Sequence, residues 1–155
     1  MKIKLPFLLA VCVCFMTFYS ANSQNIKPSI SLIKYNDNVN APLNSKELKQ
    51  INEVYGDKSN EYVLNRPQRL KDIKNLLRNR IEIKLISNPN DQKQCPLLSE
   101  VPLLNYYVSD LRRDTVFNPQ TFNPLKYLFN VNGLSGEMYR VDNTNYFIII
   151  KSQFQ

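Results

Sequence analysis

The end of the chain places the strongest constraint on the fold, because residues 146–150 (YFIII) are apolar at every position. Successive side chains of a β-strand point to opposite faces of the sheet, so such a strand needs cover on both faces. Four turn-forming residues, 142–145, separate this run from a candidate strand at 137–141. We therefore predict a C-terminal β-hairpin whose second strand, 146–151, lies in the middle of a sheet. The side chains expected to be buried are Phe147, Ile148 and Ile149.

The first predicted helix covers residues 45–55. Asn44 can cap it, and Glu47 stands three residues later, as in a reciprocal capping box. Gly56 follows at the place where helices commonly end in a residue with positive φ. The helix therefore has a start signal and a stop signal of its own.

A second helix is predicted over about residues 67–79. Asn65 is its candidate cap, and Pro67 suits the first turn, where a missing N–H group costs nothing. Apolar residues recur behind it at helical spacing, which predicts one face to bury. These residues are Leu70, Ile73, Leu76 and Leu77.

At residues 80–87 (RIEIKLIS) the apolar pattern changes to a period of two, which predicts a strand with one buried face made by Ile81, Ile83 and Leu85. Weaker signals predict strands at 29–35 and 103–108 and a short helix at 125–129. Strands and helices do not alternate regularly, so the sequence favours an α+β fold. We expect a small, mainly antiparallel sheet with a C-terminal β-hairpin and two to three helices packed on one face.

The N-terminal residues have the organisation of an export signal. A short basic stretch, residues 1–4, precedes an apolar run at 5–19. The run is shorter than the roughly twenty residues of a membrane-spanning helix. Small residues then precede the bond between Ser23 and Gln24, where we expect signal-peptide cleavage.

This organisation predicts a cleaved signal peptide at 1–23 and a single α+β domain at 24–155, exported to the periplasm or secreted, with no stable transmembrane segment in the mature chain. An uncleaved anchor is one alternative. Lipidation at Cys12 or Cys14 is another, although both lie inside the apolar run and follow a valine. The chain is rich in asparagine but has no Asn-x-Ser/Thr sequence, which favours a bacterial envelope.

Several chemistries are excluded by composition. The 155 residues include no histidine, so the usual catalytic triads and imidazole metal sites are impossible. Cys95 is the one cysteine beyond the predicted signal peptide. It is packed under a loop, or it is a reactive thiol or part of an intermolecular disulfide. The acidic residues are scattered among lysines and arginines, which argues against a glycosidase carboxylate pair. We therefore expect no enzyme, with an unrecognised role of Cys95 or of a carboxylate pair as the alternative, and no cofactor and no metal.

The second predicted helix is strongly basic, in a chain with a formal net charge of +7. At about 100° per residue, Lys71, Lys74 and Arg78 form one ridge beside the apolar face. A row of cations could bind phosphate, lipid headgroups or acidic polysaccharide. The alternative is a solvated face whose methylene groups shield the apolar stripe. The candidate binding residues are Arg66, Arg69, Lys71, Lys74 and Arg78, with Arg80 beside them.

Three stretches, residues 63–80, 121–130 and 139–151, resemble a group of short exported bacterial proteins of unknown function. The resemblance covers most of the predicted mature chain, and it implies no catalytic residue, ligand or partner. We expect a non-enzymatic exported protein that binds another envelope component, which could be a protein. Binding of anionic ligands through the basic helix is the alternative, and export makes nucleic acid an unexpected partner.

Overall fold

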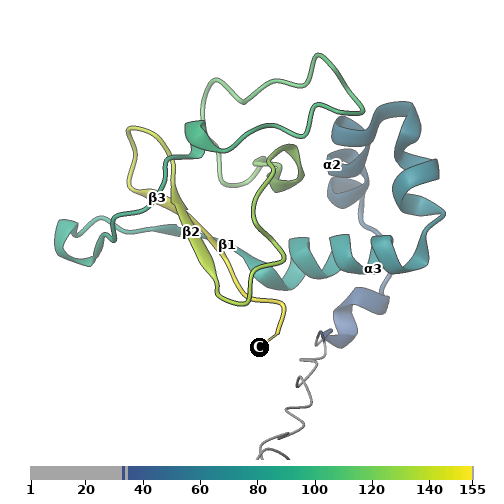
Figure 1. Ribbon diagram of the computed structural model, residues 1–155, viewed down its shortest axis with the longest axis horizontal. Helices are drawn as coiled ribbons and strands as arrows, with labels where there is room; N and C mark the ends of the chain where they lie inside the picture. The colour runs from purple at the N-terminus through teal and green to yellow at the C-terminus, as the bar shows by residue number, and fades with distance from the viewer. Residues whose placement is uncertain (1–32, 34, 155) are drawn as a thin grey trace, which may run out of the picture. The chain divides into compact units, whose positions relative to one another are not determined.

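Strand β3 (Tyr146–Ile150) lies between β1 (Ile81–Leu85) and β2 (Glu137–Arg140), and both neighbours run antiparallel to it (Figure 1). The computed structural model describes residue 33 and residues 35–154. The C-terminal hairpin and the central position of its second strand are thus confirmed. The predicted signal peptide and its cleavage site lie outside the described residues.

The hairpin turn is closed by hydrogen bonds that involve the main chain of Val141. The Val141 N–H group donates to the Tyr146 carbonyl at 2.9 Å. The N–H and hydroxyl groups of Thr144 donate to the Val141 carbonyl at 3.2 and 2.9 Å. Asn143 has a φ of 53°, a conformation that asparagine adopts more easily than most residues. These contacts fix the register that sets Ile148 opposite Tyr139.

One face of β3 packs into the larger of two apolar cores. Ile148 and Ile150 lie on this face beside Tyr139 of β2, and Ile148 is fully buried. Irregular segments between β1 and β2 supply most of the cover. The covering side chains are Leu98, Val101, Phe122, Tyr127 and Phe129.

The opposite face of β3 carries Phe147 and Ile149. Phe147 is fully buried, and the guanidinium carbon of Arg140 lies 5.8 Å from its ring centre. Ile149 is only partly buried, which differs from the prediction. Its partner in β1 is Glu82, whose carboxylate forms ion pairs at the surface, so the sheet meets water at this point.

Strand β1 forms one edge of the sheet. Ile81 and Ile83 face the larger core, as predicted, but Leu85 is 59% exposed because the strand extends beyond the core there. The chain then passes the hairpin turn, where the Gln92 side-chain amide donates to the Ile86 carbonyl at 2.8 Å. It reaches the other edge of the sheet, where Leu97 forms an isolated bridge to Arg140.

The helices share a second apolar core. Helix α2 (Ser45–Tyr55) begins with the predicted capping box: the Asn44 side chain accepts from the Glu47 N–H at 2.8 Å, and the Asn44 N–H donates to the Glu47 carboxylate at 2.9 Å. It ends before Gly56, whose φ is 51°. Helix α3 (Pro67–Asn75) contributes to the same core. The buried residues of this core are Ile51, Val54, Tyr55, Val63, Ile73 and Leu125.

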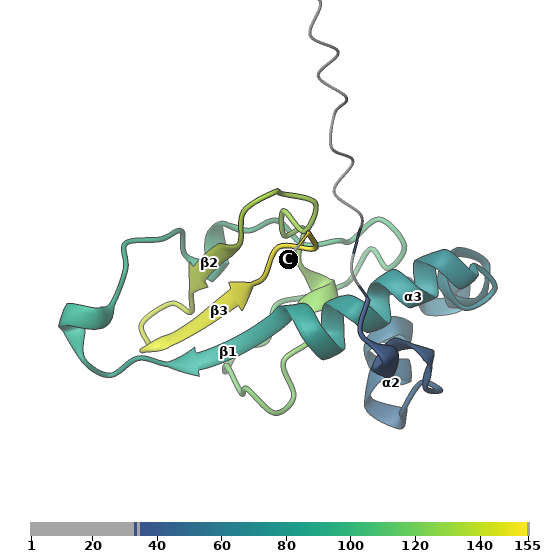
Figure 2. The same ribbon diagram turned by 90° about the horizontal axis from the view of Figure 1, so that it is seen from below.

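Helix α3 leads into β1 without a loop (Figure 2). Its first residue is a proline, as predicted, but the N-cap position is Arg66 rather than Asn65, and no side chain caps it. The α-helix is shorter than predicted because one wider, π-helical turn (Leu76–Arg80) follows it. Leu76 contacts both apolar cores, so this turn joins the helices to the sheet. The architecture is the small α+β fold that the sequence predicts.

The strand expected at residues 103–108 does not form. Leu103 makes a single isolated bridge, to Tyr127. The segment instead packs by its aromatic rings, because the ring centre of Tyr107 lies 4.8 Å from those of Tyr55 and Tyr62. Packing against the helices therefore overrides the local strand pattern.

The short helix expected at residues 125–129 is one 3-10 turn, Pro124–Lys126. Asn123 caps it by accepting from the Leu125 N–H at 3.1 Å, and its side-chain amide donates to the Gln50 carbonyl of α2 at 2.9 Å. This turn is thereby anchored to α2. Most of the strand expected at 29–35 lies outside the described residues.

Arg78 holds the segment before α2 against the π-helical turn. Its guanidinium pairs with Glu47 at 2.6 Å from both Nε and Nη2, and it also donates to the carbonyls of Asn38, Ala41 and Pro42. The two paired side chains are largely buried, at 14% and 7% exposed. Hydrogen bonds from Arg78 hold the pKa of the Glu47 carboxyl below its usual value.

Alanine substitutions should separate the two faces of β3. Ile148→Ala should lower the free energy of unfolding by about 3–5 kcal/mol, because it leaves a cavity in the larger core. Ile149→Ala should cost about 1–2 kcal/mol, since that side chain already meets water. Urea unfolding of the two variants measures both values, and equal losses would contradict the difference in burial.

Acidification should destabilise the fold through Glu47. Its pKa is lower in the folded chain than the value of about 4.3 in an unfolded one, so its contribution is present above that value and is lost as the pH falls through the folded pKa. Glu47→Gln should cost about 3 kcal/mol at neutral pH, because Arg78 loses its charged partner. Urea melts from about pH 7 to pH 3 should show a smaller acid loss in the variant; parallel profiles would contradict this assignment.

Candidate functional site

Two of the five candidate binding cations turn into the protein. Lys74 is 8% exposed, and its ammonium group donates to the Ala41 carbonyl at 2.7 Å. Arg78 is occupied by Glu47 and three carbonyls. The exposed ridge expected from Lys71, Lys74 and Arg78 therefore does not form, because a 3-10 turn before α2 packs on this side of α3.

Two further candidates lie over aromatic rings. Arg66 donates to the Glu61 carbonyl at 2.9 Å, and its guanidinium carbon lies 5.2 Å from the ring centre of Tyr62. The ammonium group of Lys71 lies 4.5 Å from the ring centre of Tyr35. Such cation–π contacts contribute only a small free energy at exposed sites. Both cations have local partners, and their role in ligand binding stays a prediction.

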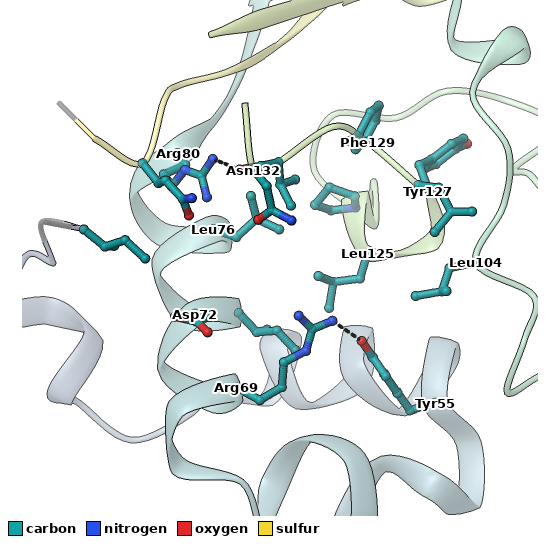
Figure 3. Close-up of a pocket in the computed structure, with 16 residues that line it drawn as sticks. Tyr55, Arg69, Asp72, Leu76, Arg80, Leu104, Leu125, Tyr127, Phe129 and Asn132 are labelled. Carbon is teal, nitrogen blue, oxygen red and sulfur yellow. Dashed lines mark hydrogen bonds between the residues drawn. The ribbon is translucent and has the colours of Figure 1, made fainter. Parts of the chain in front are cut away.

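Arg69, the fifth candidate, lines a cleft of about 270 Å³ between α3 and residues 124–132 (Figure 3). Its Nη2 atom donates to the Tyr55 hydroxyl at 2.9 Å, and its guanidinium points toward Leu125. The walls are mainly apolar. They include Ile73, Leu76, Leu104, Pro124, Leu125, Phe129 and Val131.

Arg80 lies at the other end of the cleft (Figure 3). Its Nε atom donates to the Lys151 carbonyl at 2.9 Å, and its Nη2 atom donates to the Val131 carbonyl at 2.5 Å. Burial lowers the pKa of Arg80, but a guanidinium stays charged at neutral pH. This side chain therefore supports the cleft wall and adds a second positive charge.

Asp72 is the acidic residue among the described lining residues. It accepts hydrogen bonds from the Tyr35 hydroxyl and from the Gln68 side-chain amide. Burial, together with the hydrogen bond to Asp72, raises the pKa of Tyr35 to about 12, so the phenol stays protonated and keeps donating at neutral pH. The Asp72 carboxylate also attracts the Arg80 guanidinium and so offsets part of the positive charge. The described lining contains two guanidinium groups and one carboxylate, so its net charge is positive.

This arrangement is suited to binding an anionic group that carries an apolar body. Apolar walls exclude water, and a guanidinium offers several donors in a fixed plane. In the described part of the chain, no three His, Cys, Asp or Glu side chains are placed to hold a metal ion. Cys95 is not among the lining residues, and burial raises the pKa of its thiol, which disfavours the nucleophilic thiolate.

Sequence reasoning identified one wall of this cleft and missed the other. Arg69 and the apolar face of α3 follow from helical periodicity. The Asn123-Pro124 pattern predicts the start of a short helix, but it carries no signal that this segment packs beside α3. Tyr55 likewise lies at the end of another helix. The opposite wall depends on tertiary packing alone.

Neither family models, nor curated proteins, nor solved structures match this chain. The resemblance to short exported bacterial proteins therefore stays a prediction. Within residues 33 and 35–154, no helix has the length and apolar character needed to cross a membrane. The roles given to the cleft residues rest on their own geometry and chemistry.

Proposed function

We propose that the chain is an exported, non-enzymatic envelope protein that binds a small anionic ligand with an apolar body in the cleft beside α3. The observation that carries this proposal is the position of Arg69. Its guanidinium lies on an apolar cleft, and its hydrogen-bond partner is a neutral hydroxyl. The ligand would be the envelope component that the sequence leads us to expect.

The electrostatics of the cleft favour an anion. Among the described residues, neither Arg69 nor Arg80 forms an ion pair. The Tyr55 hydroxyl and the two carbonyls that Arg80 reaches are neutral and do not cancel these charges. A carboxylate or phosphate oxygen could take the remaining donors of Arg69 in a charge-assisted hydrogen bond.

The volume of the cleft limits the size of the ligand. Typical pockets for drug-sized molecules measure about 300–1,000 Å³, so about 270 Å³ suits one headgroup or one sugar acid. A lipid headgroup and an acidic sugar share the same anionic chemistry. Arg69 is the residue of the basic helix to which this proposal assigns ligand binding. Lys74 and Arg78 form contacts within the protein, and the proposal gives them no role in binding.

Loss of the Arg69 charge should remove this binding. We expect dihexanoyl phosphatidic acid or galacturonic acid to bind the protein weakly, and Arg69→Gln to weaken that binding at least tenfold, about 1.4 kcal/mol, because a charge-assisted hydrogen bond is lost. Titration calorimetry at low and physiological salt measures both affinities.

Arg66→Gln is the matched control, since Arg66 belongs to the same basic segment and does not line the cleft. It should bind the probe as the wild type does. Equal binding by Arg69→Gln, or the absence of binding to both probes, would contradict the proposal. A similar loss in both arginine variants would indicate general attraction to a basic surface instead.

A further inference from the structure

Strand β1 is an open edge of the sheet (Figure 2). The Ile86 N–H donates to the Asn145 carbonyl at 2.9 Å, and the Lys151 N–H donates to the Arg80 carbonyl at 2.8 Å. Hydrogen-bonded positions alternate along an antiparallel pair, so even-numbered residues of β1 direct their main-chain groups toward β3. The main-chain groups of the odd-numbered residues, Ile81, Ile83 and Leu85, point outward. The Ile81 N–H donates to the Leu76 carbonyl of the π-helical turn. The Ile81 carbonyl and the main-chain groups of Ile83 and Leu85 have no main-chain partner among the described residues.

The side chains along this edge fall into two rows. Ile81 and Ile83 line a hollow of about 450 Å³ on the core side, and Leu85 continues their row with most of its surface in water. Glu82 and Lys84 stand on the other face, 36% and 52% exposed, with carboxylate and ammonium groups 3.2 Å apart. The edge therefore combines an apolar row with one charge of each sign.

The sequence of β1 is complementary to itself when it is read in the opposite direction. If two copies pair antiparallel about Ile83, Glu82 stands opposite the partner's Lys84, and Lys84 stands opposite the partner's Glu82. Ile81 then stands opposite the partner's Leu85. Opposite charges and apolar pairs both stabilise facing positions in a sheet.

The same register pairs most of the open main-chain groups. Ile83 would exchange both hydrogen bonds with the partner's Ile83, and the Ile81 carbonyl would accept from the N–H of the partner's Leu85, because these groups point outward. A shift of the pairing by two residues in one direction sets Lys84 opposite the partner's Lys84. A shift in the other direction sets Glu82 opposite the partner's Glu82. Like charges directly opposite are destabilising, so the charge pattern selects one register.

We infer that this edge binds a second copy of the chain, which gives a symmetric dimer with one continuous antiparallel sheet through both copies. Edge strands in natural proteins often carry charges that block such pairing. Here the two signs alternate so that they attract in the two-fold register, and the exposed Leu85 gains an apolar neighbour. The inference does not depend on the ligand proposed for the cleft, because no residue of β1 lines it.

Charge reversal at the edge tests this dimer. Sedimentation velocity on the exported chain, from about 10 to 500 µM at physiological salt, should show the wild type as a dimer at the upper end. Glu82→Lys alone and Lys84→Glu alone should each weaken dimerisation at least tenfold, since both oppose like charges. An equimolar mixture of the two variants should dimerise again, because the lysines of one variant face the glutamates of the other.

Two controls separate pairing from folding. Glu61→Lys changes a more exposed glutamate that lies away from β1 and pairs with Lys58 at 3.2 Å, and it should leave the dimer unchanged. The double variant Glu82→Lys with Lys84→Glu exchanges the two charges within one chain and should dimerise with itself. A wild type that stays monomeric, a single reversal that dimerises as tightly as the wild type, or a mixture and a double variant that both stay monomeric overturns the inference.

Discussion

Hydrogen bonds from cationic side chains to main-chain carbonyls hold together the irregular part of this fold. Buried carbonyl groups need donors, and outside helices and sheets the backbone supplies few. Arg113 donates to the Leu98 and Val101 carbonyls, which places these core residues over the sheet. Arg80 joins the segment at Val131 to the end of β3 through Lys151. In the described part of the chain, every buried side-chain nitrogen and oxygen has a hydrogen-bond partner.

This use of cations changes how the basic composition is interpreted. Lys74, Arg78 and Arg80 belong to one basic stretch of sequence, yet they face the protein interior and stabilise it. Lys126 is almost fully buried as well, between the carboxylates of Glu53 and Asp114. A formal net charge of +7 therefore overstates the cationic surface available to a ligand. Geometry, rather than charge count, selects Arg69 among the five candidates.

The extent to which this fold follows from its sequence depends on how local the signals are. The capping box at Asn44 and the hairpin after Val141 are short-range, and both are present. The partial burial of Ile149 was not predictable, because it depends on the charged Glu82 opposite it on another strand. The residues that cover the larger core could not be predicted either, because irregular segments have no periodic pattern of apolar residues in the sequence. The candidate site reflects the same division: its helical wall was predictable, and its opposite wall depends on packing between distant segments.

The π-helical turn before β1 connects the cleft to the sheet through Leu76 and Arg80. The side chain of Arg80 supports the cleft wall, while its carbonyl accepts from the Lys151 N–H beside β3. A substitution of Arg80 would change the cleft wall as well as any contact with the proposed ligand, so a loss of binding could not be assigned to a direct contact. Arg69 has no such structural duty among its described contacts, since it donates to one neutral hydroxyl. The cleft and the β1 edge are therefore connected through the main chain, but no side chain belongs to both. Neutralising the charge of Arg69 leaves the charges of Glu82 and Lys84 unchanged.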